Sequence, residues 1–244
     1  MPRFFIDKTQ ITDHTITLFK EEAAHIASSL RMTVGEKLTL CDGEGLDYDA
    51  EILSVSREAV VLSIVSAVPS KTEPPYRIRL YQCLPKGDKL ETVIQKAVEC
   101  GVCEIVPVQS SRCIVKWKSD DAAKKLTRYN RIAEEAAKQS GRGRIPTVLP
   151  PMSYKAALSE MAGDALAFLC YENEDGKTLS SLLRDCQRPT TISFLIGPEG
   201  GLSPEEVTLA IENGILSLSL GERILRTETA STFVLAILSA FFEL

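Results

Sequence analysis

The stretch FLIGPEGGLS, residues 194–203, begins as an apolar strand and changes at once to glycine, proline and glutamate. The residues that follow complete a capping box, Ser203 with Glu206, and put Pro204 at the first helical position. A strand, a glycine-rich turn and a capped helix in succession are typical of an α/β protein with a mainly parallel sheet. Ligands of such sheets gather at the carboxyl ends of the strands, where glycine lets the backbone come close.

The negative charge of Glu199 limits which classes of ligand this turn can bind. The turn matches neither the G-x-G-x-x-G dinucleotide fingerprint nor the P-loop, which requires Gly-Lys-Ser/Thr. Glu199 would repel a polyphosphate, whereas it tolerates a cationic ligand or accepts hydrogen bonds from hydroxyl groups.

A second glycine turn, LGERILRTETA at residues 220–230, follows a strand-like run at 215–220. The two junctions lie one helix apart, and we interpret them as opposite walls of a single cleft. The alternative is two ordinary turns that share no ligand. The second turn leads into an apolar last helix, which carries Phe233, Val234, Ile237, Leu238 and Phe241.

The same alternation of strands and helices begins near residue 76. Tyr76, Ile78 and Leu80 alternate as a strand, and Asp88 is placed to cap a helix that Gly101 ends. The apolar face of that helix consists of Leu90, Val93, Ile94, Ala97 and Val98. Further strand-like runs lie at 104–108, 165–170, 191–196 and 215–220.

The first part of the chain has a different pattern. Short apolar runs at 37–41, 48–53 and 59–65 are separated by turn signals, and one helix is expected near 21–30. Three prolines among polar residues at 66–75 indicate a linker. We therefore predict a small β-barrel at 1–70 and an α/β domain at 75–244.

Charge is unevenly distributed along the chain. The formal net charge is −5, yet ten bases stand against four acids between Arg112 and Arg144. These bases are Arg112, Lys116, Lys118, Lys124, Lys125, Arg128, Arg131, Lys138, Arg142 and Arg144, and the acids are Asp120, Asp121, Glu134 and Glu135. Such an asymmetry favours a polyanionic partner.

A predicted helix carries part of this charge. Lys124, Arg128, Arg131, Glu135 and Lys138 share one of its faces, and Leu126, Tyr129, Ala133 and Ala136 share another. Contact with phosphates and a solvated face with internal salt bridges are both compatible with this pattern.

Composition excludes several classes of site. Seven cysteines without an export signal indicate free thiols, and Cys100 and Cys103 lack the second pair that a zinc site needs. We expect no metal. The N-terminal residues lack a signal-peptide core and no apolar run is long enough for a bilayer, so we expect a cytoplasmic protein without a membrane segment.

Four motifs together resemble one family. LIGPEGGLSPEEV (195–207) and LSLGERILRTETAS (218–231) follow EEAAKQSGRGRIP (134–146) and HIASSLRMTVGEKLTLCDGEG (25–45). Over essentially the whole chain the sequence is similar to the RsmE family of bacterial 16S rRNA uridine-N3 methyltransferases, in the SPOUT superfamily. Cys100 and Cys103 depart from the aliphatic residues usual there.

The resemblance implies a PUA-like barrel, a trefoil-knotted α/β domain and a homodimer that acts on 16S rRNA of the small subunit. It also implies S-adenosylmethionine (SAM) as the methyl donor, whose sulfonium cation agrees with the acidic turn. The implied donor-binding residues are Leu195, Ile196, Gly197, Gly200, Gly201, Leu218, Leu220, Gly221, Ile224 and Leu225.

Methylation at N3 requires an exposed base and stabilisation of negative charge as the proton leaves. We predict that Arg226 orients or stabilises the uracil and that Glu228 or Glu199 assists deprotonation. The alternatives are a salt bridge for Arg226 and a helix-capping role for Glu228. RNA contacts are predicted for Arg3, Arg31, Arg112, Arg142 and Arg144.

Two other functions remain open at this point. Related SPOUT enzymes methylate ribose 2′-hydroxyls with similar glycine loops, and a PUA-type protein without catalysis would act as an RNA-binding assembly factor. Binding of SAM argues against the second, and the identity of the methylated nucleoside separates the first.

Overall fold

The computed structural model describes residues 3–117, 119–184 and 186–244. Contacts group the chain into two compact units. The first is the chain up to Glu73 joined by Ala137–Ile145, and the second is Pro74–Ala136 with Pro146–Leu244. Assignment of 1–70 and 75–244 as the two domains stays a prediction, and it did not include the contribution of Ala137–Ile145 to the first unit.

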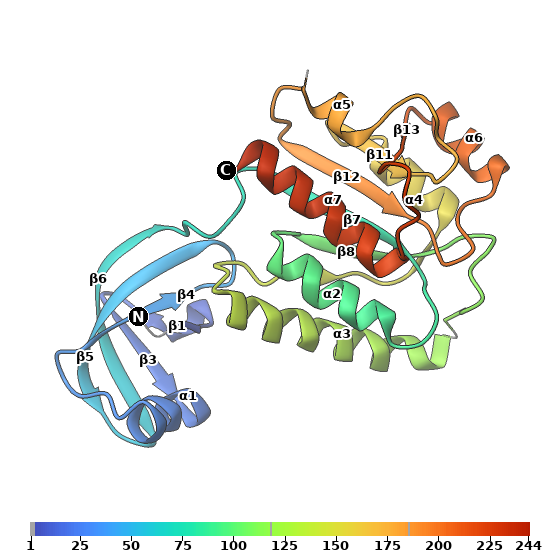
Figure 1. Ribbon diagram of the computed structural model, residues 1–244. Coiled ribbons are helices and arrows are strands. Elements are labelled where there is room, and N and C mark those ends of the chain that lie inside the picture. The colour runs from blue at the N-terminus through green and yellow to red at the C-terminus, as the bar shows by residue number, and fades with distance from the viewer. Residues whose placement is uncertain (1–2, 118, 185) are drawn as a thin grey trace. The chain divides into compact units, whose positions relative to one another are not determined.

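A six-stranded curled sheet forms the first unit, in the order β1-β4-β5-β6-β3-β2 (Figure 1). Only β1 and β4 pair in parallel; the other neighbours are antiparallel. The strands are β1 (Arg3–Phe5), β2 (Ile11–Thr12), β3 (Thr15–Phe19), β4 (Lys37–Cys41), β5 (Leu46–Val55) and β6 (Ala59–Pro69), and a 3-10 turn, η1 (Lys8–Gln10), precedes β2.

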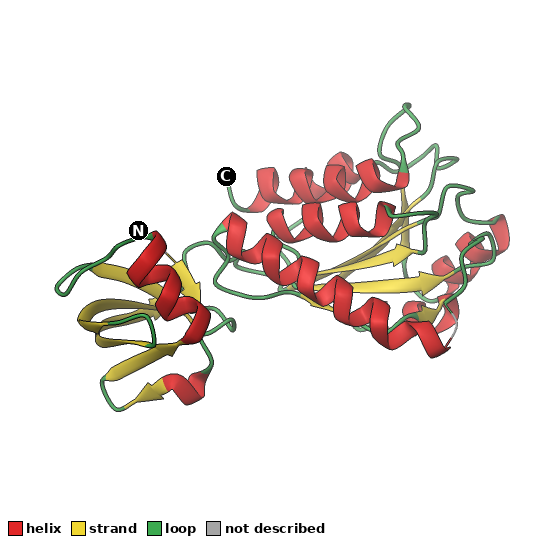
Figure 2. Ribbon diagram, turned by 90° about the horizontal axis from the view of Figure 1, so that it is seen from below, coloured by secondary structure: helices red, strands yellow, loops and turns green. Residues whose placement is uncertain are grey.

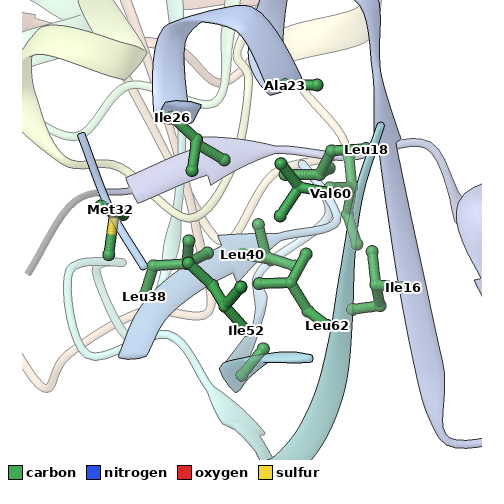
Figure 3. Packing of buried hydrophobic residues seen from close by; sticks show 12 residues of the cluster. Ile16, Leu18, Ala23, Ile26, Met32, Leu38, Leu40, Ile52, Val60 and Leu62 are labelled. Atoms are coloured by element: carbon green, nitrogen blue, oxygen red, sulfur yellow. The ribbon is translucent and has the colours of Figure 1, made fainter. Parts of the chain in front are cut away.

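Alternating residues of these strands build the core of the first unit. In Figure 3, side chains from β3, β4, β5 and β6 point toward one another beneath the helix. The core includes Ile16, Leu18, Ile26, Leu38, Leu40, Ile52, Val60 and Leu62, all at most 1% exposed. Period-two alternation places every second residue of a strand on one face, which is why this pattern predicts the strands.

One of two local predictions for the first unit needs correction. The helix expected near 21–30 is present, as an α-helical turn, α1 (Lys20–Ala24), that continues as a π-helical turn, η2 (His25–Ser29). The expected linker at 66–75 begins too early, because β6 continues to Pro69 by pairing with Leu46 of β5. Proline is tolerated there because it lies at the end of the strand.

A buried ion pair anchors the segment Ala137–Ile145 to the first unit. Arg142 is 2% exposed, and its Nε and Nη2 donate to Oε1 and Oε2 of Glu73 at 2.9 and 2.7 Å. The backbone amides of Gly143 and Arg144 donate to the same Glu73 carboxylate at 2.9 and 3.1 Å. One carboxylate therefore fixes three consecutive residues.

We expect Glu73→Ala to reduce the free energy of unfolding by about 3 kcal/mol, because it leaves the Arg142 charge buried without its carboxylate. Urea unfolding followed by circular dichroism measures the loss. Glu58→Ala, which removes an exposed carboxylate from a turn of the same unit, serves as the control. Equal losses in the two variants would contradict the assigned role of Glu73.

The second unit contains a seven-stranded sheet in which every pair is parallel. Its order is β10-β8-β7-β12-β11-β13, with β9 beside β8, and the mainly parallel α/β prediction is confirmed. The strands are β7 (Arg77–Cys83), β8 (Glu104–Gln109), β9 (Thr147–Val148), β10 (Met152–Ser153), β11 (Leu166–Cys170), β12 (Thr191–Ile196) and β13 (Leu216–Leu218).

Helices connect these strands, and the last helix follows β13. They are α2 (Lys89–Glu99), α3 (Ser119–Ser140), α4 (Tyr154–Met161), α5 (Leu179–Arg184), α6 (Pro204–Glu212) and α7 (Thr227–Phe242). Figure 2 shows α7, α2 and α3 side by side along the sheet, and α2 packs against α7. Within the described residues, none of the helices combines the length and apolarity that a membrane span needs.

The N-termini of two helices in this unit, α6 and α2, were predicted to carry capping side chains. Ser203 and Glu206 form the predicted capping box at the start of α6, with Pro204 in its first turn. The predicted apolar face of α2 is buried, but Asp88 stands at its N-cap without a side-chain hydrogen bond, so capping by that side chain is wrong. Its backbone carbonyl accepts from Glu91 N instead.

Candidate active site

One cavity of about 980 Å³ opens where β11, β12 and β13 end. These strands are neighbours in the sheet and parallel, so their carboxyl ends meet at one edge. The two glycine turns, 197–202 and 219–226, line the cavity together. The prediction that they form walls of a single cleft is confirmed by this arrangement.

The structure places most of the predicted donor-binding residues at the cavity. Those that line it are Ile196, Gly197, Gly200, Gly201, Leu220, Gly221, Ile224 and Leu225. Leu195 and Leu218 are fully buried and are not part of the lining. Both are strand residues, and their side chains pack in the hydrophobic core.

A third wall was missed by the sequence analysis. The loop after β11 brings Cys170, Tyr171, Glu172, Glu174, Asp175 and Thr178 to the cavity. Its strand was predicted, but the polar run YENEDGK that follows was not examined as a site. A signal was available, because this polar run directly follows the predicted strand at 165–170 and parallel strands end at one edge of the sheet; the place of β11 between β12 and β13 is known only from the structure.

Two glycines in the first turn leave little room for a side chain. A Cβ on Gly197 would lie 3.3 Å from the Gly201 carbonyl carbon and from Leu202 Cγ. Gly201 has a φ of +65°, and a Cβ there would lie 2.5 Å from Glu172 Oε1, at the end of a flexible side chain. The positive φ of Gly201 favours glycine, and Gly197 lets the two ends of the turn come close together.

Lys89 joins two of the predicted catalytic carboxylates. Its Nζ lies 2.8 Å from Glu199 Oε1 and 3.8 Å from Glu228 Oε2. Glu199 also accepts a hydrogen bond from the Lys86 amide at 3.1 Å. Glu228 is not among the lining residues, and its Oε2 is buried without a hydrogen-bond partner. Lys89 lines the cavity but was not predicted.

These contacts shift the pKa values of Glu199 and Lys89. Partial burial acts to raise the pKa of Glu199, but the hydrogen bonds from Lys89 and from backbone amides outweigh it and hold that pKa below its usual value. The hydrogen bond to Glu199 raises the pKa of Lys89. Glu199 is therefore an ionised partner of Lys89 and a weak proton acceptor.

Arg226 is exposed and lines the cavity at the N-cap of α7. Within the described residues no carboxylate lies within salt-bridge distance of its guanidinium, so the structure gives no support to the salt bridge with Glu222 or Glu228 that was considered as an alternative. A planar donor group without an internal partner is available to a substrate.

A chain of hydrogen bonds fixes the start of the first turn. Gln82 is fully buried in β7 and its Nε2 donates to Thr227 Oγ1 at 2.8 Å. The Thr227 hydroxyl in turn donates to the Gly197 carbonyl at 2.8 Å. Three segments distant in sequence thereby hold one cavity-lining carbonyl in place.

Thr227→Val should break this chain while keeping the side-chain volume. We expect a loss of about 1 kcal/mol in the free energy of unfolding, because the buried Gln82 amide keeps only its bond to the Cys83 carbonyl and the half-buried Gly197 carbonyl loses the Thr227 donor. Thermal and urea unfolding measure it. Thr227→Ser keeps the hydroxyl and should retain most of the stability; equal loss in both variants would argue against the hydrogen-bond chain.

The arginines predicted to bind RNA differ in availability. Arg31 and Arg112 are exposed and Arg144 is half-buried, whereas Arg142 is held by Glu73. Arg3 donates to Cys41, Asp47 and Ser70, with 2.5 Å between its Nη2 and Asp47 Oδ1. The guanidinium groups of Arg3 and Arg142 are thus engaged within the first unit, so we do not propose them as phosphate ligands.

On α3 the predicted faces are present. The charged residues Lys124, Arg128, Arg131, Glu135 and Lys138 are exposed, and Tyr129, Ala133 and Ala136 are buried. Arg131 pairs with Glu135 within the helix, so the alternative of intrahelical salt bridges is realised at this pair, whereas Arg128 pairs with Glu91 of α2. Lys118 and the side chains of Asp120 and Asp121 lie outside the described residues.

Comparison with protein families matches both parts of the chain. An RNA methyltransferase domain matches residues 72–239, and an RNA methyltransferase PUA domain matches residues 20–65. The ribosomal RNA small subunit methyltransferase E of Bacillus subtilis (strain 168) is 34% identical over 100% of this chain and 98% of its own length. The chain belongs to the ribosomal RNA small subunit methyltransferase E family. The predicted RsmE resemblance is confirmed.

Solved structures agree with this family. The ribosomal RNA small subunit methyltransferase E of Neisseria gonorrhoeae, bound to SAM, is 34% identical with a TM-score of 0.82, covering 99% of this chain and 98% of that one. A protein of Legionella pneumophila described as a methyltransferase, also in complex with SAM, is 35% identical with a TM-score of 0.78 over 98% and 96%. The trefoil knot implied by the family stays a prediction.

Cysteines and acids of this family member were also examined for metal sites. All seven cysteines are free. In the part of the chain that the structure describes, no three or more His, Cys, Asp or Glu residues come together as a metal site would require.

Proposed function

We propose that this chain transfers a methyl group from SAM to N3 of a uridine in the 16S rRNA of the small ribosomal subunit, in the cytoplasm. The observation that carries the proposal is the single cavity bounded by the two glycine turns, in a chain that belongs to an RNA methyltransferase family. The uridine and its N3 atom rest on the resemblance to RsmE.

The cavity residues fit the donor. A volume of about 980 Å³ is in the range that holds a ligand of this size. Gly197 and Gly201 leave the backbone of the cavity wall accessible to a ligand. The acidic side chains of Glu172, Glu174 and Asp175 suit a cationic ligand. Bound SAM would supply a methyl group on a sulfonium leaving group, which is why we propose a reaction without a metal.

Arg226 is the residue we assign to the uracil. Loss of the N3 proton puts negative charge on the ring and its carbonyl oxygens. The Arg226 guanidinium is exposed, unpaired and at the cavity, so its N–H groups can donate to those oxygens as the charge develops. The same donors would fix the orientation of the ring.

Glu228 is a better candidate than Glu199 for the proton acceptor. Glu199 is hydrogen-bonded to Lys89 and Lys86, and its lowered pKa makes it a poor base. Glu228 Oε2 accepts no hydrogen bond, and it lies 3.8 Å from Lys89 Nζ. Glu228 does not line the cavity, so we propose that a water molecule passes the N3 proton to its carboxylate.

The substrate is proposed to approach along the exposed bases. Arg112 donates from Nη1 to the Gly200 carbonyl at 2.8 Å, so it borders the first glycine turn, residues 197–202 (the donor turn), while remaining exposed. With Arg31 and Arg144 it supplies phosphate contacts whose strength falls steeply with salt.

Nucleoside mass spectrometry tests the proposal. rRNA from a strain that lacks this gene should have no N3-methyluridine at the target, and purified protein with SAM should restore it. Loss of a ribose 2′-O-methylated nucleoside instead would favour the first alternative. An unchanged nucleoside profile together with no SAM binding by calorimetry would favour the assembly factor.

A homodimer is proposed for the same protein. On α7, Phe233 and Ile237 are half-buried and Phe241 is 46% exposed, one turn apart along the helix. A second copy would cover this stripe. Light scattering coupled to size-exclusion chromatography measures the mass, and a monomer at micromolar concentration would contradict the dimer.

A further inference from the structure

Glu172 has an unusual position in the loop after β11. Its carboxylate lies against the Cα of Gly201, where a Cβ would be 2.5 and 2.8 Å from its two oxygens. The side chain is exposed to the cavity, and within the described residues it has no hydrogen bond or ion pair. A carboxylate that has no partner within the described residues thus lies at the donor turn, where Gly201 leaves room for it.

Two other carboxylates that line the cavity have partners. Glu199 is bound by Lys89, and Glu174 accepts a hydrogen bond from the Gly176 amide at 3.1 Å. Glu228 lies near Lys89 behind the lining. Asp175 and Glu222 are also exposed and line the cavity. Glu172, however, supplies the atoms closest to the Cβ position of Gly201.

We infer that Glu172 is the specificity-determining counter-charge for the sulfonium of SAM, and that it lets the site distinguish the donor from its product. This inference rests on the proposed function. S-adenosylhomocysteine, the product, has a neutral sulfur but keeps the ammonium and carboxylate of the donor. A carboxylate at the sulfur therefore favours SAM over the product.

The chemistry of the two cationic centres supports the sulfonium over the ammonium. An ammonium donates three hydrogen bonds and is recognised by carbonyl oxygens as well as by charge. A sulfonium has no N–H group to donate, so the attraction of a carboxylate for it comes mainly from the opposite charges. A carboxylate that rests on a glycine Cα and carries no hydrogen bond provides such a field.

Isothermal titration calorimetry of Glu172→Gln with SAM and with S-adenosylhomocysteine tests this. The amide keeps the shape of the side chain and removes its charge. We expect the dissociation constant for SAM to rise about tenfold, as for a partly exposed ion pair, with little change for the product. The ratio of the two constants, which needs no turnover, is the measured quantity.

Glu212→Gln is the matched control, since it removes an exposed carboxylate of the same unit that does not line the cavity. Its ratio should equal that of the unmodified chain. An unchanged ratio in Glu172→Gln overturns the inference, and so does equal weakening of both ligands, which would place the carboxylate at the ammonium. Failure of the unmodified chain to bind SAM would instead overturn the proposed function.

Discussion

Arg226→Ala should lower the rate of methyl transfer by about 100-fold or more while SAM affinity stays within about twofold. Removal of one donor aimed at developing negative charge has an effect of this size in other enzymes. The side chain lies at the cavity without an internal partner, so its loss leaves no buried charge behind. Single-turnover methylation of rRNA measures the rate, and calorimetry measures donor binding.

Arg184→Ala is the control for this variant. Arg184 is an exposed arginine in the last turn of α5 and does not line the cavity, so both its rate and its affinity should stay unchanged. Arg226→Lys keeps the charge but loses the planar fork of donors, and an intermediate rate is expected. A rate within a few-fold of normal in Arg226→Ala would remove the residue from the mechanism.

The local pattern of the chain was enough to predict most of the second unit. The capping box at Ser203 and the apolar face of α2 are local features, and both are present. The single cleft was also predictable, because parallel strands that are followed by glycine turns end at the same edge.

Long-range partners could not be read from the sequence. Lys89 is 110 residues from Glu199, and no local pattern indicates that the two side chains meet. Glu73 with Arg142 is a similar case, in which a base predicted to bind RNA is neutralised by an acid in the expected linker. Charge counting treats such bases as free, and only tertiary structure shows which of them are paired.

The role of Gly201 illustrates the same limit. A glycine in a ligand turn predicts close approach of backbone to the donor. The structure shows that the nearest obstacle to a side chain at Gly201 is the Glu172 carboxylate, from a loop that the sequence analysis did not examine. One glycine thus connects the predicted turn with the missed wall.

Gly201→Ala should weaken SAM binding by up to about tenfold and reduce the free energy of unfolding by about 1–2 kcal/mol. The loss of stability follows from the φ of +65°, which disfavours a Cβ. The loss of affinity has a second cause. A methyl group at Gly201 pushes the flexible Glu172 side chain away from the donor turn, since their separation would be only 2.5 Å. Calorimetry with SAM and urea unfolding measure the two effects.

Gly214→Ala separates these causes. Gly214 has a φ of +80°, nothing lies within 4 Å of its Cβ position, and it does not line the cavity. It should therefore lose stability but keep its SAM affinity. A double-mutant cycle adds the decisive comparison. If Gly201→Ala acts by displacing Glu172, then Glu172→Gln added to it should cause little further loss of affinity. Full additivity of the two losses would show that the methyl group acts on the donor directly and that Glu172 is not the group it displaces.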